Sequence, residues 1–423
     1  MSFAFFAGTI EPGSIIIFMN QRELFLQHIA QTSPAPLALE IVKAEGCLLY
    51  DKEGRTYVDL IGGISVANTG HRHPKVLESI KNQLDAYLHI MVYGEFIETP
   101  QVQYARLLAE NLPAPLHSVY FTNSGTEAVE GAMKLAKRIT NRSKIISFKN
   151  SYHGSTQGAL SIIGSEYWRN AFRPLLPGIS HLEYGSMEAL NTIDNQTCCV
   201  IAETVQAEAG ILAPSKEWMQ ALRKKCTGTG TLLILDEVQT GFGRTGTLWG
   251  FEHFGIIPDI VVLGKALGGG MPLGAFIASR EMMRSLSDEP VLGHITTFGG
   301  HPVCCAAGMA AFKALMNENL MDDLQRKEDL FRSLLIHPAI KTVRSFGLWL
   351  AVEFDTFEVN KKVIDHCISS RNYRGDINGV ITDWFLFAPN CLRISPPLTI
   401  SDEQIKKACE IILKGCDEML DTR

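Results

Sequence analysis

Two strand-like segments in the middle of the chain end in side chains that could do chemistry. The run TLLILDEV reaches an acid at Asp236, and the run DIVVLGKALGGG carries Lys265 among small residues. A carboxylate at the end of a buried strand is costly unless it has a partner, such as a protonated ring nitrogen. A lysine in such surroundings tends to have a lowered pKa and can condense with a carbonyl group. Taken alone, Asp236 is also compatible with an N-cap or a structural ion pair, and Lys265 with an ordinary surface lysine.

A glycine turn earlier in the chain joins a predicted strand to a predicted helix. It reads Ser124-Gly125-Thr126, within the run NSGTEAVEGAMKLA. The glycine lets backbone amides approach an anion, the two hydroxyls add donors, and a helix N-terminus favours negative charge. The turn is therefore compatible with a phosphate site and equally with a plain N-cap, where serine and threonine are common.

Taken together, these features match the needs of one organic cofactor, pyridoxal phosphate. It requires an anchor for its phosphate, an aromatic face such as Tyr152, an acid for its pyridine nitrogen and an amine for its aldehyde. Asp236 would keep the ring nitrogen protonated. Lys265, once a substrate amine displaces it from the aldehyde, would be free to act as general base and acid.

The elements that position these residues follow from the hydrophobic pattern. From about residue 100 to 310, apolar runs rich in valine and isoleucine alternate with helical patterns. This alternation predicts an α/β fold with a mostly parallel sheet covered on both faces. Ligands of such sheets bind at the carboxyl ends of the strands. One crevice is therefore expected to collect the residues at predicted strand ends, which are Asn123, Tyr152, Glu203, Asp236 and Lys265.

After residue 310 the alternation stops. A long helix is predicted over 310–335, segments 342–354 and 379–397 are predicted as strands of a second, smaller sheet, and Ser401 with Gln404 predicts a capping box at a final helix. We expect an extension at 1–18, the N-terminal part of a small domain at 19–75, a large cofactor-binding domain at 76–310 and the C-terminal part of the small domain at 311–423.

Two other patterns suggest chemistry that their surroundings do not support. Gly241 to Gly246 matches the dinucleotide pattern GxGxxG, but no helical period follows, so a loop is expected instead. His71 and His73 lack a third ligand nearby, so no metal site is expected, and Pro74 fits the first position of a helix.

The composition argues against several classes of protein. The chain has 423 residues, 46% of them hydrophobic, and a formal net charge of -6, which speaks against nucleic-acid binding. No run of about 18 apolar residues is free of charge, so no membrane span is expected. Ten cysteines without a CxxC pattern, and a first segment without a basic start, predict reduced thiols and a cytoplasmic protein.

Seven motifs, in this order, resemble one enzyme family. They are YVDLIGGISVANTGHRHP, NSGTEAVEGAMKLA, YHGST, DEVQTGFGRTG, PDIVVLGKALGGGMPLGA, TTFGGHP and LRISPPL, and the resemblance covers about residues 35 to 415. The family is that of the class III (subgroup II) pyridoxal-phosphate aminotransferases, the acetylornithine, ornithine and 4-aminobutyrate group. The resemblance implies fold type I, with a mostly parallel seven-stranded sheet in a large domain and a smaller α+β domain. It also implies a transaminase that moves an amino group to a 2-oxo acid, and a terminal amino group is expected.

The resemblance implies a role for each matching residue of the cofactor site. Lys265 would hold the cofactor covalently, Asp236 would pair with its ring nitrogen, and Gln239 would lie by the ring hydroxyl. Tyr152 would stack on the ring. The other residues expected to bind the cofactor are Ser124, Gly125 and Thr126 at the phosphate, together with His153, Glu203 and, from the other subunit of a homodimer, Thr297.

For the substrate, the resemblance implies an arginine and a glutamate that alternate between two partners. Arg393 would bind a substrate carboxylate, and Glu208 would pair with Arg393 when a substrate without a carboxylate at that position enters. Such an exchange lets one site accept two different substrates in turn.

Three departures from the family pattern bear on the substrate. Ser155 stands where those relatives usually have an arginine, and serine cannot pair bidentately with a carboxylate. His301 replaces the usual asparagine, and residues 89–100 also differ. Acetylornithine or ornithine with 2-oxoglutarate is the expected substrate pair. The alternatives are an ω-amine or β-amino acid transaminase, or an aminomutase of the same fold.

Overall fold

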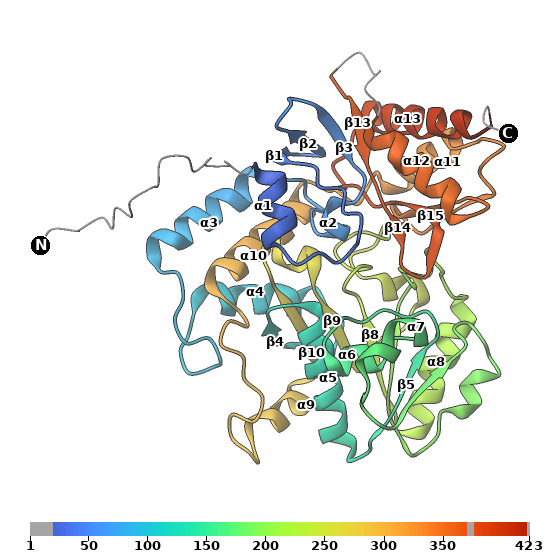
Figure 1. The fold of residues 1–423 in the computed structure, drawn as a ribbon. Helices are drawn as coiled ribbons and strands as arrows, with labels where there is room; N and C mark the ends of the chain where they lie inside the picture. Colours follow the sequence, from blue (N-terminus) through green and yellow to red (C-terminus); the bar gives the residue numbers. More distant parts are fainter. Residues whose placement is uncertain (1–19, 370–375, 421–423) are drawn as a thin grey trace, which may run out of the picture.

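Three β-sheets organise the chain in the computed structural model, which describes residues 20–369 and 376–420. The predicted extension at 1–18 lies outside the described residues. The largest sheet occupies the lower part of Figure 1. Its strands, in spatial order, are β4 (Ser118–Thr122), β10 (Gly274–Ala278), β9 (Ile260–Leu263), β8 (Leu232–Asp236), β7 (Thr197–Glu203), β5 (Lys144–Phe148) and β6 (Ile179–Leu182).

The seven-stranded sheet is mostly parallel, as the sequence predicts, and β10 alone among its strands runs antiparallel to its neighbours. Every residue of β7, β9 and β10 is buried. Two helices, α5 (Gly125–Thr140) and α8 (Lys216–Thr229), pack against the sheet, and alternate strand residues fall into two separate hydrophobic clusters. β6 and β10 are short and poor in β-branched residues, which is why the sequence pattern does not identify them.

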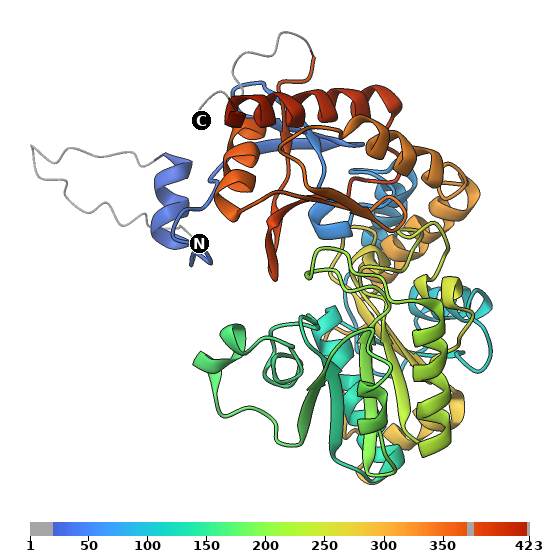
Figure 2. The ribbon, with the colours of Figure 1, turned by 90° about the vertical axis from the view of Figure 1, so that its right-hand side faces the viewer.

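Two four-stranded sheets form the rest of the β-structure. One has the order β1 (Ile41–Glu45), β2 (Leu48–Asp51), β3 (Thr56–Asp59), β13 (Gly379–Ile381), and the other β11 (Thr342–Ser345), β12 (Leu350–Glu353), β15 (Ala388–Ile394), β14 (Trp384–Phe385). The prediction that 342–354 and 379–397 share one sheet is therefore wrong for β13, which pairs in parallel with β3. This pairing joins an N-terminal segment to a C-terminal one, and the blue strands β1 to β3 lie beside the orange-red C-terminal elements in the upper part of Figures 1 and 2.

The remaining helices lie between the sheets and around them. They are α1 (Gln21–His28), α2 (Gly62–Ser65), α3 (Pro74–Ala86), α4 (Thr99–Glu110), α6 (Gln157–Ser161), α7 (Glu166–Arg169), α9 (Arg280–Arg284), α10 (Pro302–Asn317), α11 (Leu324–Leu334), α12 (Phe357–Ser369) and α13 (Asp402–Leu420). Short 3-10 helices are η1 (Asn170–Phe172), η2 (Ala189–Thr192), η3 (Gly250–Phe254), η4 (Lys265–Gly268) and η5 (Ser285–Ser287). Among residues 20–369 and 376–420, no helix is both long and apolar enough to cross a membrane.

The single helix predicted over 310–335 is wrong, because the chain breaks it into α10 and α11. Asn319, between them, has a φ of 50°, a left-handed conformation that asparagine tolerates better than most residues. The predicted capping box is confirmed. The Ser401 amide donates to Oε1 of Gln404 at 3.0 Å, and the Gln404 amide donates to Oγ of Ser401 at 3.2 Å. The predicted domain boundaries stay predictions, and the one at 310 falls inside α10.

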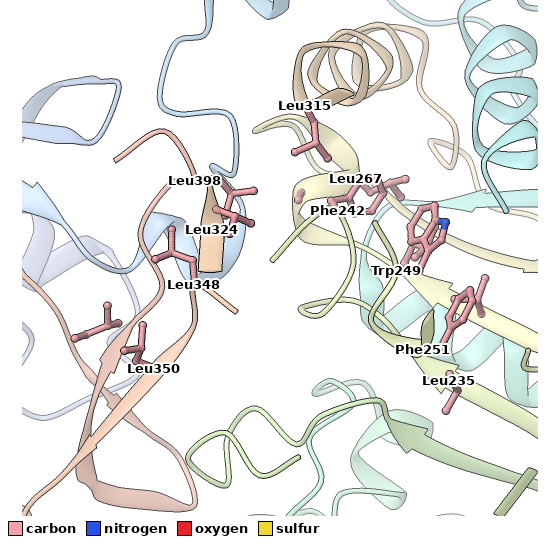
Figure 3. Close-up of a cluster of buried hydrophobic side chains, with 14 of the residues drawn as sticks. Leu235, Phe242, Trp249, Phe251, Leu267, Leu315, Leu324, Leu348, Leu350 and Leu398 are labelled. Atoms are coloured by element: carbon pink, nitrogen blue, oxygen red, sulfur yellow. The ribbon is translucent and has the colours of Figure 1, made fainter. Parts of the chain in front are cut away.

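One hydrophobic core runs from the seven-stranded sheet to the C-terminal elements. Figure 3 shows both parts, with Trp249 and Phe251 on one side and Leu324 and Leu348 on the other. The GxGxxG segment connects them. Its buried Arg244 donates to the carbonyls of Leu348 and Pro396 at 2.8 Å each and to the side chain of Asn68 at 2.6 Å. The segment is a loop, as expected, and its arginine holds the two parts of the molecule together.

Candidate active site

A cavity of about 300 Å³ lies where several strands of the seven-stranded sheet end. Asp236 and Glu203 are the last residues of β8 and β7, and Lys265 follows β9 by two residues. The cavity is lined by Gly125, Thr126, Tyr152, His153, Gly154, Ser155, Glu203, Val205, Asp236, Val238, Gln239, Thr240 and Lys265. Four of the five residues expected in one crevice are therefore among those that line this cavity, and the fifth, Asn123, lies two residues before Gly125.

The N-terminus of α5 opens onto the cavity. Gly125 and Thr126 are the first two residues of this helix, so their amides have no partner within the helix itself. Ser124 is the N-cap, and its hydroxyl accepts from the Glu127 amide at 3.3 Å. The hydroxyls of Thr126 and Thr156 lie 2.8 Å apart. The serine therefore caps the helix, while Gly125 and Thr126 line the cavity, which is compatible with the expected phosphate site.

Asp236 lies at the bottom of the site and is held from two sides. Nδ1 of His153 donates to its Oδ2 at 2.7 Å, and the Val238 amide donates to its Oδ1 at 3.0 Å. Both side chains are almost completely buried. Nε2 of His153 is buried and has no hydrogen-bond partner among the described residues. The carboxylate is therefore fixed in direction while it still faces the cavity.

Lys265 carries the amine of the site. Burial lowers its pKa to about 8, although the carboxylates of Glu208 and Asp236 act in the opposite direction. A lowered pKa is what the sequence predicts for a lysine among small residues. The residue has a φ of 48°, a strained conformation for a side chain other than glycine. Within the described part of the chain, its Nζ makes no hydrogen bond or ion pair, so the amine is free to react.

Tyr152 and Glu203 belong to the loop after β5 and the end of β7. The Tyr152 amide donates to Oε1 of Glu203 at 3.0 Å, and the Ala207 amide donates to Oε2 at 2.8 Å. Burial raises the pKa of Glu203 well above its usual range. The hydroxyl of Tyr152 lies 3.0 Å from that of Ser155, which is exposed at the mouth of the cavity. Glu203 therefore stabilises the loop that carries Tyr152 through these hydrogen bonds.

Glu208 and Arg393 form a buried bidentate pair. NH1 and NH2 of the arginine donate to Oε1 and Oε2 of the glutamate at 3.1 and 2.9 Å. Burial would raise the pKa of Glu208, but the charge and hydrogen bonds of Arg393 outweigh it and the pKa is lowered. Nε2 of Gln239 also donates to Oε1 of Glu208, at a long 3.4 Å, while Oε1 of Gln239 is buried without a partner among the described residues. Gln239 thus links this pair to the cavity.

Ser124, Glu208 and Arg393 lie next to residues that line the cavity, whereas Thr297 and His301 lie apart from it. Thr297 is exposed on the segment before α10, outside the set of lining residues. His301 is the N-cap of α10, where its Nδ1 accepts from the Val303 amide at 3.3 Å. Its ring stacks on His89, with 5.3 Å between the centroids. The replacement of asparagine by histidine at 301 therefore has a structural explanation, because the stacked partner comes from the equally unusual segment 89–100.

The groups that face the cavity fit pyridoxal phosphate. The helix amides of Gly125 and Thr126 suit a phosphate, Asp236 suits a protonated ring nitrogen, and Oε1 of Gln239 is an unused acceptor. A Cβ at Gly125 would lie 3.0 Å from a methyl group of Val238, so a larger residue there would have to displace the Val238 side chain. The half-buried Lys265 supplies the amine that an aldehyde requires.

Several residues at the site were not predicted from the sequence: Gly154, Val205, Val238 and Thr240, which line the cavity, and Asp383, which contacts Arg393. Val238 lines the cavity, but a valine in an apolar run carries no signal of its own. Asp383 accepts from Nε of Arg393 at 2.8 Å. The contact follows from the antiparallel pairing of β14 with β15. This pairing places Trp384 opposite Leu392, so Asp383, which precedes Trp384, lies next to Arg393, which follows Leu392.

Comparisons with known proteins agree with this site. The family described as aminotransferase class-III matches residues 29–415. The acetylornithine aminotransferase of Methanopyrus kandleri is 40% identical over 396 residues, which cover 92% of this chain and 97% of that protein. A structure of the ornithine aminotransferase of Toxoplasma gondii, with pyridoxal phosphate at partial occupancy in its active site, is 30% identical and covers 92% of both chains, with a TM-score of 0.84. An (S)-enantioselective omega-transaminase from Thermomicrobium roseum is 28% identical and covers 94% of this chain and 97% of that one, with a TM-score of 0.82.

These matches also confirm fold type I for the seven-stranded sheet and its flanking small sheets. The matched region contains the turn Ser124-Gly125-Thr126 together with Asp236 and Lys265. The chain belongs to the class-III aminotransferases, which use pyridoxal phosphate to move an amino group from an amine to a 2-oxo acid.

Proposed function

We propose that Lys265 binds the cofactor aldehyde and, once released from it by the substrate, moves the proton at the reacting carbon. When bound, the cofactor stabilises the negative charge left on that carbon. Asp236 keeps the ring nitrogen protonated, and His153 holds Asp236 in place through its 2.7 Å hydrogen bond. The amides of Gly125 and Thr126 bind the phosphate, while Tyr152 covers the ring and Gln239 faces its hydroxyl. The cavity that these residues line together supports these roles.

We further propose that the substrates are of the acetylornithine or ornithine type, with 2-oxoglutarate as acceptor. The observation that supports this best is the bidentate pair of Glu208 and Arg393 beside the cavity. With the pair closed, Arg393 is not free to bind a carboxylate, so an uncharged carbon chain ending in an amine can enter. With Glu208 turned away, Arg393 can bind the carboxylate of an oxo acid.

A second candidate is an ω-amine or β-amino acid transaminase, and Ser155 is the observation that favours it. This exposed serine contacts the hydroxyl of Tyr152, where an arginine would hold a second carboxylate. Serine offers one hydroxyl and no charge, so a substrate with two carboxylates loses a bidentate partner there. Donors with a single charged group would not suffer this loss.

A screen of single half-reactions distinguishes the candidates. Ornithine, acetylornithine, 4-aminobutyrate, β-alanine and diamines would each be mixed with the holoenzyme, and the change in the cofactor's visible absorbance on taking up the amino group would be followed. An acetylornithine-type enzyme responds to the first two, whereas an ω-amine enzyme responds to β-alanine or diamines. Turnover without any added oxo acid would instead identify an aminomutase, and no response to any amine would contradict both proposals.

We expect Ser155→Arg to improve substrates with a second carboxylate, lowering the KM of glutamate and 2-oxoglutarate about tenfold, because a charge-assisted bidentate pair contributes roughly 1.5–3 kcal/mol. The KM values of both variants would be compared by steady-state kinetics. Ser165→Arg, at the N-cap of α7 on the surface, is a matched control for the added charge. If the wild type already handles glutamate as well as Ser155→Arg does, Ser155 does not determine the substrate.

We propose a homodimer in which Thr297 reaches the cofactor phosphate of the other subunit, and a cytoplasmic location. The exposure of Thr297 away from the cavity of its own chain supports the first proposal, and ten free, buried thiols support the second.

Thr297→Ala is expected to weaken cofactor binding about tenfold. In dimers mixed from Thr297→Ala and Lys265→Ala chains, the sites that keep Lys265 should bind the cofactor with wild-type affinity. Weak binding in the mixture would place Thr297 in the site of its own chain.

A further inference from the structure

The guanidinium of Arg393 is enclosed on three sides, each by different residues. Its NH1–NH2 edge faces Glu208. Its other edge donates from Nε to Oδ1 of Asp383 at 2.8 Å and from NH2 to the carbonyl of Trp384 at 3.2 Å. The ring of Phe385 covers one face of the guanidinium, 4.3 Å from its carbon. Arg393 therefore donates four hydrogen bonds, and residues 383 and 384 accept two of them.

We propose that Asp383 is a positioning residue that fixes the guanidinium of Arg393, so that a substrate carboxylate can bind only at the edge now paired with Glu208. This proposal rests on the proposed role of Arg393 as the carboxylate-binding residue. Asp383 itself does not touch the substrate and acts through the arginine.

The backbone makes Asp383 a fixed partner. Arg393 lies on β15, and its amide donates to the carbonyl of Asp383 at 2.9 Å, while the hydroxyl of Thr382 donates to the carbonyl of Arg393 at 2.6 Å. Acid and arginine are therefore cross-strand neighbours, and they move as one unit. These hydrogen bonds keep the two residues side by side, so the Asp383 carboxylate stays within reach of Nε.

Glu208 lies outside this strand pair. It follows β7 and meets the hairpin through its carboxylate, which accepts from the Leu386 amide at 3.0 Å, and through its carbonyl, which accepts from the Phe387 amide at 2.9 Å. Its side chain can rotate away while its backbone contact stays. When it does, Asp383 still accepts from Nε of Arg393, so the buried guanidinium keeps a hydrogen-bond partner that holds its orientation. The arginine then offers one open edge in an unchanged orientation.

The consequence for specificity is a single, directional carboxylate subsite. The carboxylate of the oxo acid replaces that of Glu208 in the same plane, with two parallel hydrogen bonds. With one face covered by Phe385 and the Nε edge occupied, the edge now paired with Glu208 is the one that can offer a carboxylate two parallel hydrogen bonds. The amino donor enters while Glu208 is still paired with Arg393. A change in the position of Arg393 should therefore weaken binding of the oxo acid far more than binding of the amine.

The test compares the two half-reactions of the holoenzyme in Asp383 variants. Asp383→Ala is expected to raise the KM of the oxo acid about tenfold, since a hydrogen bond to a charged group is lost, while the limiting rate with the best amino donor stays within about threefold. Asp383→Asn keeps an oxygen acceptor for Nε and should bring that KM back to within about threefold of the wild type. Should Asp383→Ala fail to fold, Asp383→Glu shifts the carboxylate by one methylene, and the KM should still rise about fivefold.

Asp259→Ala is the matched control. Asp259 also accepts from an arginine, Arg223, at 2.8 Å, and its side chain is 30% exposed compared with 32% for Asp383. It precedes β9, at the strand end opposite Lys265, so the KM of the oxo acid should not change. Equal losses in both half-reactions, an unchanged KM, or an asparagine variant as poor as the alanine variant would each overturn the proposal. If Arg393→Lys leaves the KM of the oxo acid unchanged, the proposed role of Arg393 fails as well.

Discussion

Replacing Lys265 with alanine is expected to lower turnover at least about a thousandfold, or about 4 kcal/mol of activation free energy. The variant loses both the amine that holds the cofactor aldehyde and the base that moves the proton. The cavity itself should persist, because Nζ makes no hydrogen bond or ion pair with the described residues that its loss would leave unsatisfied. Turnover would be measured with the best donor from the half-reaction screen, and the visible absorbance of the lysine-bound cofactor should vanish.

Lys149→Ala is the matched control for Lys265. Lys149 follows β5 directly, but its side chain is 55% exposed and pairs with Glu183, so turnover should not change. In the wild type, capture of the cofactor aldehyde by the apoprotein should accelerate with pH up to about 8 and then level off, because the neutral amine is the reactive form and burial lowers the pKa from 10.5 to about 8. A variant without Lys265 that keeps more than a hundredth of the wild-type turnover would contradict its assigned role.

Asp236→Asn is expected to lower turnover about a hundredfold to a thousandfold, because removal of one member of a buried charge pair costs roughly 3–5 kcal/mol. Asparagine has nearly the same shape and can still accept from the Val238 amide, but it cannot hold a proton on the cofactor nitrogen. Turnover with the best donor is the measurement. Addition of a cofactor analogue with a permanently charged ring nitrogen should restore part of the rate, which a purely structural role would not allow.

Asp59→Asn tests whether the loss belongs to the site. Asp59 is buried and lies 2.7 Å from Nε2 of His71, so it repeats the acid–histidine contact of Asp236 and His153 outside the cavity. Both substitutions should reduce the free energy of unfolding by a similar amount, measured by denaturant titration. Only Asp236→Asn should reduce the turnover of the folded enzyme. Equal turnover in the two variants would show that Asp236 is only structural.

The chemical part of the site could be predicted from the sequence because its residues are local to strand ends. Apolar runs determine which strands are buried, and the first polar residue after such a run must face the edge where ligands bind. Asp236, Glu203 and Lys265 were predicted in this way, and the structure brings them to one cavity. The phosphate turn is equally local, since a glycine between a strand and a helix determines its shape.

Other features depend on contacts between segments far apart in the chain. The stacking of His301 on His89 is one, and the pairing of β13 with β3 is another. No local pattern distinguishes a strand that joins the nearest sheet from one that crosses to another, because both bury the same apolar side chains. Similarly, the break at Asn319 depends on a single residue in a continuous helical pattern.

The sequence by itself determined the cofactor, the acid and the amine, because each needs a particular residue type at a particular point of a strand. For the substrate carboxylates, Arg393, Glu208 and Ser155 were expected from the family resemblance alone, and Asp383 was not predicted. The contact of Asp383 with Arg393 follows only from the pairing of β14 with β15, which brings residues ten positions apart side by side, and the position of Ser155 beside Tyr152 follows only from the folded loop. Substrate choice therefore depends on the tertiary structure, because contacts between separate segments decide which charged side chains remain unpaired and can bind a substrate.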